Sequence, residues 1–150
     1  MKRNTNKVKF TVVFVLIALL LVGMCATVVT LDKQIETETV NVWAFKNGEL
    51  NEDGKYVESD SALYLEEMLS VDGLEIEIVE DADITYKIYF YDADKKYLSA
   101  SAELSENYTY STVENAEYFR VVITPVGDEE ISLFEKNGYA KQLTITVDRA

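Results

Sequence analysis

The most prominent feature of the hydrophobic pattern is an uninterrupted apolar stretch near the N-terminus, Phe10–Leu31, which contains no charged residue. As an α-helix with a rise of about 1.5 Å per residue, this stretch is long enough to cross the hydrocarbon core of a bilayer. A helix also satisfies its own backbone polar groups, as a lipid environment requires. The pattern therefore predicts a single transmembrane helix at residues 10–31, with the lipid bilayer as its partner.

The charges on either side of this stretch predict its orientation. Four basic residues precede it within residues 1–9, whereas the first charged residues after it are Asp32 and Lys33. Because positively charged flanks stay on the cytoplasmic side, we expect residues 1–9 to form a short cytoplasmic tail. The chain is then a single-pass protein of the cell membrane, with its N-terminus in the cytoplasm and its C-terminal domain outside it.

Two processing signals compete with a permanent anchor. A signal peptide cleaved after Ala26 requires a small residue where Met24 stands, and cleavage after Cys25 leaves a strongly apolar new N-terminus. Attachment of lipid to Cys25 likewise requires a small residue in place of Met24. We therefore expect an uncleaved signal anchor, while both forms of processing stay open as alternatives.

Beyond a short polar stalk at residues 32–38, the pattern changes to short alternations of apolar and polar residues. The clearest strands are Leu74–Val79, Ile84–Tyr91 and Tyr118–Thr124, in which every second residue is apolar. Ser61–Ser70 is ambiguous between a short helix and an extended segment. Further strands or extended pieces are expected at Val40–Phe45, Lys55–Glu58, Lys96–Ala100, Tyr108–Ser111, Glu130–Phe134 and Leu143–Val147.

Turn signals separate these segments and predict the fold class. Asn47-Gly48, Asp53-Gly54 and Asp72-Gly73 are dipeptides typical of tight turns between strands. About seven or eight short strands, spaced roughly ten residues apart, favour an antiparallel β-sandwich. No long apolar helical period lies outside residues 10–31. We therefore predict an all-β domain at residues 39–150, preceded by the transmembrane helix.

The charge distribution limits the partners of this domain. All 27 acidic residues follow residue 30, together with only 10 of the 14 basic ones, which gives residues 31–150 a formal charge of −17. Such a domain repels nucleic acid and anionic lipid headgroups, so nucleic acid is not an expected partner. The chain has no histidine, which excludes histidine-dependent catalytic triads and the common zinc sites.

Three segments resemble a known type of domain: Tyr86–Ser101, Ala116–Pro125 and Tyr139–Asp148 are similar to the carbohydrate-binding-module-like jelly-roll domains of bacterial cell-surface and phage tail proteins. The shared features include a strand ending in Phe90-Tyr91-Asp92, followed by a turn and Tyr97-Leu98-Ser99. The resemblance implies a jelly-roll-like β-sandwich with one concave face. Some relatives hold sugars there, and some hold a structural calcium ion.

A set of aromatic and basic residues forms the first candidate site. Flat rings suit the apolar face of a sugar, and arginine supplies hydrogen-bond donors, so a cell-envelope glycan is a candidate ligand. The alternative is that these residues make ordinary cross-strand pairs. In that case the domain is a structural or protein-interaction module of the envelope without glycan binding. The candidate residues, expected on the side of their strands away from the core, are Trp43, Tyr89, Tyr91, Tyr118 and Arg120.

Acidic residues form a second candidate site. Asp92 and Asp94 are expected in a turn, where carboxylates commonly bind calcium. This pair does not match the EF-hand pattern, and aspartates are also frequent in turns that bind nothing. Structural calcium at Asp92 and Asp94 is therefore an open prediction, and no other cofactor is expected. Since no catalytic motif is recognisable, we expect a binding module rather than an enzyme.

Overall fold

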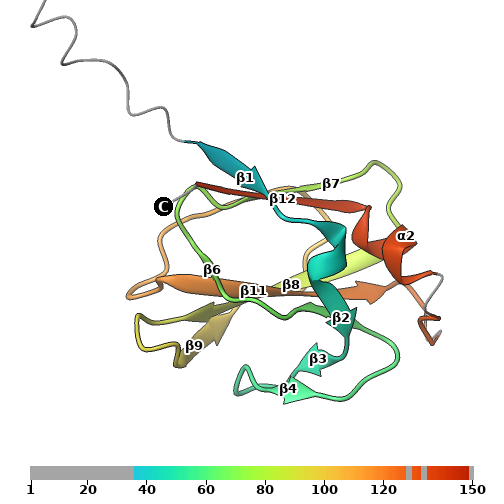
Figure 1. The fold of residues 1–150 in the computed structure, drawn as a ribbon, viewed down its shortest axis with the longest axis horizontal. Helices are drawn as coiled ribbons and strands as arrows, with labels where there is room; N and C mark the ends of the chain where they lie inside the picture. The colour runs from blue at the N-terminus through green and yellow to red at the C-terminus, as the bar shows by residue number, and fades with distance from the viewer. Residues whose placement is uncertain (1–35, 128–129, 133–134, 149–150) are drawn as a thin grey trace, which may run out of the picture. The chain divides into compact units, whose positions relative to one another are not determined.

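A computed structural model describes residues 36–127, 130–132 and 135–148 of the chain (Figure 1). The predicted cytoplasmic tail, the predicted membrane span at residues 10–31 and most of the predicted stalk lie outside these ranges. Within them, no helix is both long and apolar enough to cross a membrane. The described residues are mostly β-strand, and the strands pair in antiparallel fashion.

Two antiparallel sheets enclose the main core (Figure 1). The four-stranded sheet has, in spatial order, β1 (Thr37–Thr39), β12 (Leu143–Asp148), β7 (Glu75–Ile78) and β10 (Tyr108–Thr109). The six-stranded sheet has, in spatial order, β2 (Phe45–Asn47), β5 (Leu63–Leu65), β11 (Tyr118–Pro125), β8 (Ile84–Tyr91) and β9 (Tyr97–Ala100), while β6 (Leu69–Ser70) also pairs with β11.

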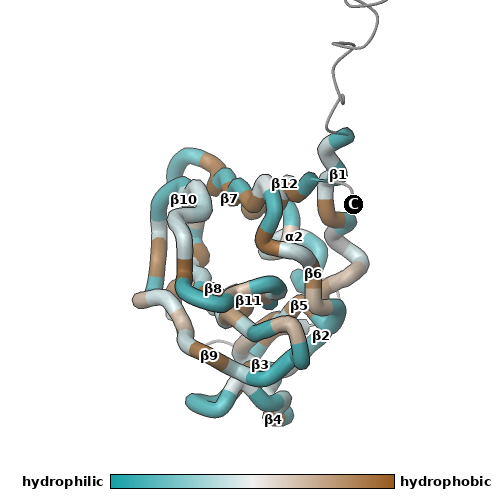
Figure 2. The backbone as a smooth tube through the Cα atoms, turned by 90° about the vertical axis from the view of Figure 1, so that its left-hand side faces the viewer, coloured by the Kyte–Doolittle hydropathy of each residue, from teal (hydrophilic) through white to brown (hydrophobic). Residues whose placement is uncertain are grey.

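A small hairpin of two strands and two short helices complete the described structure. The strands β3 (Glu49–Leu50) and β4 (Tyr56–Val57) form a two-stranded hairpin of their own. The hairpin lies on the outer side of the six-stranded sheet, away from the four-stranded sheet (Figure 2). The 3-10 helix η1 (Val42–Ala44) leads into β2, and the short helix α2 (Lys136–Ala140) precedes β12.

The alternating pattern of β8 and β11 builds the main core. Ile88 of β8 lies opposite Val121 of β11, and both are completely buried together with Phe119. Ile76 and Ile145 face them from the four-stranded sheet as part of the same cluster. Burial of each such side chain contributes about 1.5–3 kcal/mol relative to leaving it exposed. The strands with the clearest period of two are therefore those that hold the sheets together.

Most of the predicted strands are confirmed, but the first one is wrong. Val40–Phe45 does not form a single strand, because η1 interrupts it and β2 begins only at Phe45. The Asn41 side chain accepts a hydrogen bond from the backbone N–H of Trp43 at 2.9 Å, which stabilises a turn in place of extended backbone. Consequently Phe45 enters the main core, whereas Trp43 is 70% exposed.

Other boundaries also differ from the sequence-based expectation. The ambiguous segment Ser61–Ser70 is extended, since β5 and β6 lie within it. The domain starts inside the predicted stalk, because Thr37 and Glu38 pair with Asp148 and Val147 to form β1. The described residues 130–132 are not strand, and α2 follows where no helix was expected.

Candidate binding pocket beside the β3–β4 hairpin

A second buried cluster lies on the outer face of the six-stranded sheet, opposite the main core. Leu50 of the hairpin packs there against side chains of β5, β8 and β11, whereas the partly buried Tyr97 and Tyr118 lie at its edge. Since both faces of the sheet are covered here, the side chains on either side of β8 become buried. We call this cluster the outer cluster; its buried members are Leu50, Ala62, Tyr64, Tyr89, Tyr91 and Val122.

Two tyrosine hydroxyl groups attach the hairpin to the sheet. Tyr89 donates a hydrogen bond to the carbonyl oxygen of Leu50 at 2.7 Å, and Tyr91 donates one to the carbonyl oxygen of Gly54 at 2.8 Å. Only 6% of Tyr89 and 2% of Tyr91 are exposed. Both residues thus point to the predicted side of the sheet, but the hairpin covers their rings. They shape the site from beneath and offer no flat surface to a sugar.

The environment keeps these hydroxyl groups protonated. Burial raises the pKa of Tyr91 to about 12, although the nearby Arg120 guanidinium acts in the opposite direction. Burial also raises the pKa of Tyr89. Because neutral phenols are hydrogen-bond donors, both attachments to the hairpin persist at physiological pH.

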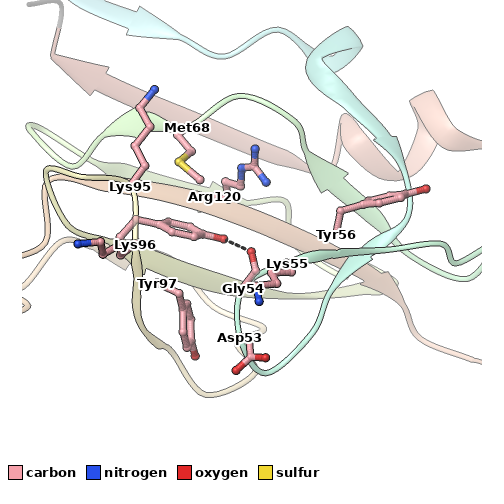
Figure 3. Close-up of a pocket in the computed structure, with 10 residues that line it drawn as sticks. Asp53, Gly54, Lys55, Tyr56, Met68, Lys95, Lys96, Tyr97 and Arg120 are labelled. Carbon is pink, nitrogen blue, oxygen red and sulfur yellow. Dashed lines mark hydrogen bonds between the residues drawn. The ribbon is translucent and has the colours of Figure 1, made fainter.

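A pocket of about 630 Å³ opens between the hairpin and the turn that joins β8 to β9 (Figure 3). Its volume falls within the usual range for small-molecule sites. Figure 3 shows that the hairpin contributes Gly54, Lys55 and Tyr56, while the β8–β9 turn contributes Lys95 and Lys96. We call it the hairpin pocket; its lining residues are Asp53, Gly54, Lys55, Tyr56, Met68, Tyr91, Lys95, Lys96, Tyr97 and Arg120.

The wall formed by the hairpin has a fixed local geometry. The Asn51 side-chain oxygen accepts hydrogen bonds from the backbone N–H groups of Asp53 and Lys55, each at 3.0 Å. Gly54 has a φ of 66°, a left-handed conformation that favours glycine. A Cβ at Gly54 would stand 2.6 Å from Cδ2 of Tyr97. Glycine is therefore required here both by backbone conformation and by the close approach of the sheet.

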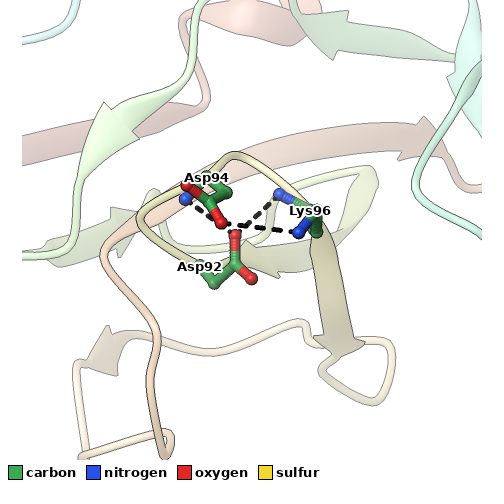
Figure 4. A network of polar contacts seen from close by, with 3 residues as sticks. All are labelled: Asp92, Asp94 and Lys96. Carbon is green, nitrogen blue, oxygen red and sulfur yellow. Dashed lines mark hydrogen bonds and ion pairs between the residues drawn. The ribbon is translucent and has the colours of Figure 1, made fainter.

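The opposite wall, the β8–β9 turn, repeats this device with an aspartate (Figure 4). Asp92 Oδ1 accepts hydrogen bonds from the backbone N–H groups of Asp94 and Lys96, both at 2.9 Å. The Nζ atom of Lys96 lies 3.4 Å from Oδ2 of Asp94. Between them, Lys95 has a left-handed φ of 61°. The two turns hold lysine side chains at the rim of the hairpin pocket.

These contacts bear on the predicted calcium site. Calcium takes six to eight oxygen ligands, but Asp92 already holds the turn and Asp94 faces the Lys96 ammonium. No group of three or more acidic, histidine or cysteine side chains placed to hold a metal occurs in the described residues. The Asp92 carboxylate thus serves the turn, and structural calcium at Asp92 and Asp94 stays a prediction.

The charge of the hairpin pocket is opposite to that of the domain. The described part of the chain contains eight lysine and arginine residues, and four of them line this pocket, against a single acid, Asp53. The Arg120 guanidinium donates to the carbonyl oxygen of Glu66 at 2.6 Å, a neutral partner. The Nζ atom of Lys95 lies 5.4 Å from the ring centroid of Tyr118. Most of the positive charge is thus not neutralised by a carboxylate.

Two tyrosines outside the predicted set of site residues, Tyr56 and Tyr97, also line the hairpin pocket. Tyr56 is 52% exposed, and its ring centroid lies 5.1 Å from that of Tyr64. Tyr97 packs edge-on against Tyr91, with 6.1 Å between the ring centroids. In the sequence both residues lie next to predicted turns, and Tyr97 also belongs to the segment that carries the family resemblance.

The predicted aromatic and basic set is only partly brought together. Tyr91 and Arg120 line the hairpin pocket, and Tyr118 adjoins it through Lys95. Tyr89 instead lines a neighbouring pocket of about 430 Å³ on the other side of the hairpin. Trp43 lines neither of these two pockets.

No family model matches the chain, and searches among characterised proteins and among solved structures found no significant match.

Proposed function

We propose that the chain is a membrane-anchored binding module whose β-domain lies outside the cytoplasm and binds cell-envelope glycan in the hairpin pocket. The apolar stretch Phe10–Leu31 and its basic N-terminal flank support the anchor and its orientation. The observation that carries the binding function is the composition of the pocket. It brings the half-exposed Tyr56, Arg120 and three lysines together in the lining of one concave site.

We also infer that the two sheets form a jelly roll, as the sequence resemblance implies. A jelly roll is a long antiparallel ribbon wound into two sheets, in which the first strand pairs with the last and successive pairs follow inward. The pairs β1–β12, β5–β11, β7–β10 and β8–β9 support this interpretation. Fold alone does not establish function, so glycan binding rests on the pocket.

The arrangement of the lining suits a sugar ring chemically. The C–H face of a pyranose packs on aromatic rings, and its hydroxyl groups need hydrogen-bond donors and acceptors at the edge. Tyr56 and Tyr97 are accessible aromatic residues of the lining, whereas the lysine and arginine groups supply donors. The chain has no histidine, and the lining has one carboxylate, which favours binding over hydrolysis.

Retention on polysaccharide tests this proposal. The full chain, purified in a mild non-ionic detergent, is applied to isolated cell-wall material and to insoluble polysaccharides. We expect retention, and we expect Tyr56→Ser to weaken it about three- to tenfold because a stacking contact is lost. Trp43→Ser is the matched control, since Trp43 is also an exposed aromatic residue but lies outside the pocket.

Two outcomes would overturn the proposal in different ways. If no polysaccharide retains the chain, glycan binding is wrong, and a protein-interaction module of the envelope becomes the better hypothesis. If Trp43→Ser weakens retention while Tyr56→Ser does not, the glycan site lies elsewhere on the domain. Release of soluble sugar products would show an enzyme in place of a binding module.

The anchor has an independent test. We expect the intact mass of the protein in the membrane fraction to include residues 10–31. Loss of about 25 residues would show removal of a signal peptide, and an added lipid mass at Cys25 would show lipid attachment.

A further inference from the structure

We infer that the hairpin pocket selects an anionic saccharide, one that carries carboxylate or phosphate groups, over a neutral one. This inference rests on the proposed function and names the chemical class of its ligand. The observation behind it is a local reversal of charge. Residues 31–150 carry a formal charge of −17, yet four cationic side chains and one acid line this pocket.

The cationic side chains of the hairpin pocket differ in the ion pairs and hydrogen bonds that they already form within the protein. Lys96 forms an exposed ion pair with Asp94, and Arg120 donates to a backbone carbonyl group. Lys55 and Lys95 are exposed and take part in neither of the ion pairs found among the described residues. Each wall of the pocket therefore contributes one exposed lysine without a carboxylate partner in these ion pairs, although Lys95 Nζ also lies 5.4 Å from the Tyr118 ring centroid.

The backbone of Lys95 gives an independent reason to assign it a role in binding. Its φ of 61° lies in the left-handed region, where residues other than glycine, asparagine and aspartate are disfavoured. Gly54 occupies the corresponding conformation in the opposite turn. A lysine in such a position costs stability, which is consistent with a contribution of its side chain to function.

The neighbouring pocket shows that this charge is specific to one side of the hairpin. That pocket contains Glu49 and Glu52 and only one cation, Lys87. An anionic group placed there would be repelled by two carboxylates, whereas in the hairpin pocket it would be attracted. Two neighbouring pockets that share Tyr97 thus have linings of opposite charge, and the anionic ligand suits the one lined by Arg120.

Binding of three soluble polymers to the full chain in non-ionic detergent tests the inference. The probes are polygalacturonate for carboxylate, poly(ribitol phosphate) for phosphate and dextran as a neutral polymer. We expect at least one anionic polymer to bind about tenfold or more tightly than dextran, with affinity falling as salt is raised. The two anionic arms identify which group is preferred.

Variants at the two accessible lysines locate the binding. Lys55→Gln and Lys95→Gly should each weaken binding of the anionic polymer about two- to fivefold. Lys95→Gly also relieves the left-handed backbone, so its stability should equal or exceed that of the parent. Lys141→Gln removes one positive charge outside the pocket and is the matched control, with binding expected within about twofold of the parent.

Each outcome separates this inference from the proposed function. Equal binding of dextran and the anionic polymers would overturn the inference and leave glycan binding intact. The same holds if Lys95→Gly folds stably and binds the anionic polymer like the parent. Failure of all three polymers and of cell-wall material to bind would overturn both.

Discussion

The six-stranded sheet has a buried cluster on each face, and the two clusters differ in chemistry. Among the described residues, the main core has 18 buried members, almost all aliphatic or phenylalanine, with Tyr86 as the one buried tyrosine. The outer cluster has six buried members in the same part of the chain, and three of them, Tyr64, Tyr89 and Tyr91, are tyrosines. The stability of the main core comes from the apolar area that it removes from water. The stability of the outer cluster comes both from burial and from directed hydrogen bonds.

This difference shows how a single strand serves both fold and site. In β8, Ile88 and Phe90 face the main core, while Tyr89 and Tyr91 between and after them face the hairpin. An apolar side chain would also bury area beneath the hairpin, but it would not determine where the hairpin sits. The hydroxyl groups do so, because each bonds to one particular carbonyl oxygen, that of Leu50 or of Gly54.

The largest expected effect comes from breaking the main core. Phe119 is completely buried between the sheets, and Phe119→Ala should lower the free energy of unfolding by about 3–5 kcal/mol, through lost burial and the cavity left behind. Urea denaturation followed by circular dichroism measures this. A loss below about 1 kcal/mol would mean that the sheets do not share a tightly packed core.

Gly54→Ala perturbs the outer cluster and should cause the next largest loss of stability. An alanine is strained at a φ of 66°, and its Cβ would collide with Tyr97 and with the Tyr91 hydroxyl group. We expect a loss of about 1–3 kcal/mol in the free energy of unfolding by urea denaturation.

Gly138→Ala is the control for this substitution. Gly138 lies in α2 with open space around its Cβ position, so the same change there should be neutral or stabilise the domain by up to about 1 kcal/mol. If both variants behave alike, the close approach of the hairpin to the sheet contributes nothing to stability.

The same contrast explains how much of the molecule the sequence predicts. The main core follows from alternation within β7, β8 and β11, because a strict period of two assigns every second residue to one face. The outer cluster does not follow, because in a strand such as β8 a tyrosine under a hairpin and a tyrosine facing solvent have the same local pattern. What covers Tyr89 and Tyr91 depends on the hairpin, whose residues are about 40 positions away in the sequence.

The candidate site illustrates the same limit. Arg120 and Tyr91 were identified because they lie on strong strands, whereas Lys55 and Lys95 belong to turns that meet only in the folded domain. Trp43 was misplaced for a local reason. The hydrogen bond from its backbone to the Asn41 side chain forms a turn where the apolar pattern favoured a strand.

Alkaline pH provides a milder perturbation of both clusters. Burial raises the pKa of Tyr86 and that of Tyr91 from 10.0 to about 12. In the unfolded chain these phenols lose their protons near pH 10, so the stability that they contribute is complete below pH 10 and is lost as the pH rises toward 12. We expect the free energy of unfolding, measured in urea, to fall across this interval.

Single substitutions show how much of this pH dependence comes from the tyrosine of each cluster. Tyr86→Phe removes the titrating group of the main core, and Tyr91→Phe removes one from the outer cluster. Each variant should lose less stability than the parent between pH 10 and pH 12, because it lacks one of the two phenols whose pKa is raised by burial. A profile identical to that of the parent in both variants would contradict the assignment of these tyrosines.

The smallest expected effect isolates a single attachment of the hairpin at neutral pH. Tyr91→Phe keeps the buried ring but removes the hydrogen bond to the Gly54 carbonyl oxygen, which should cost about 1 kcal/mol. The hairpin should then open more often, and trypsin should cleave after the adjacent Lys55 about fivefold faster. Cleavage after Lys141, outside the pocket, should keep its rate. Faster cleavage at both sites would mean that the hydroxyl group stabilises the whole domain, and not the hairpin in particular.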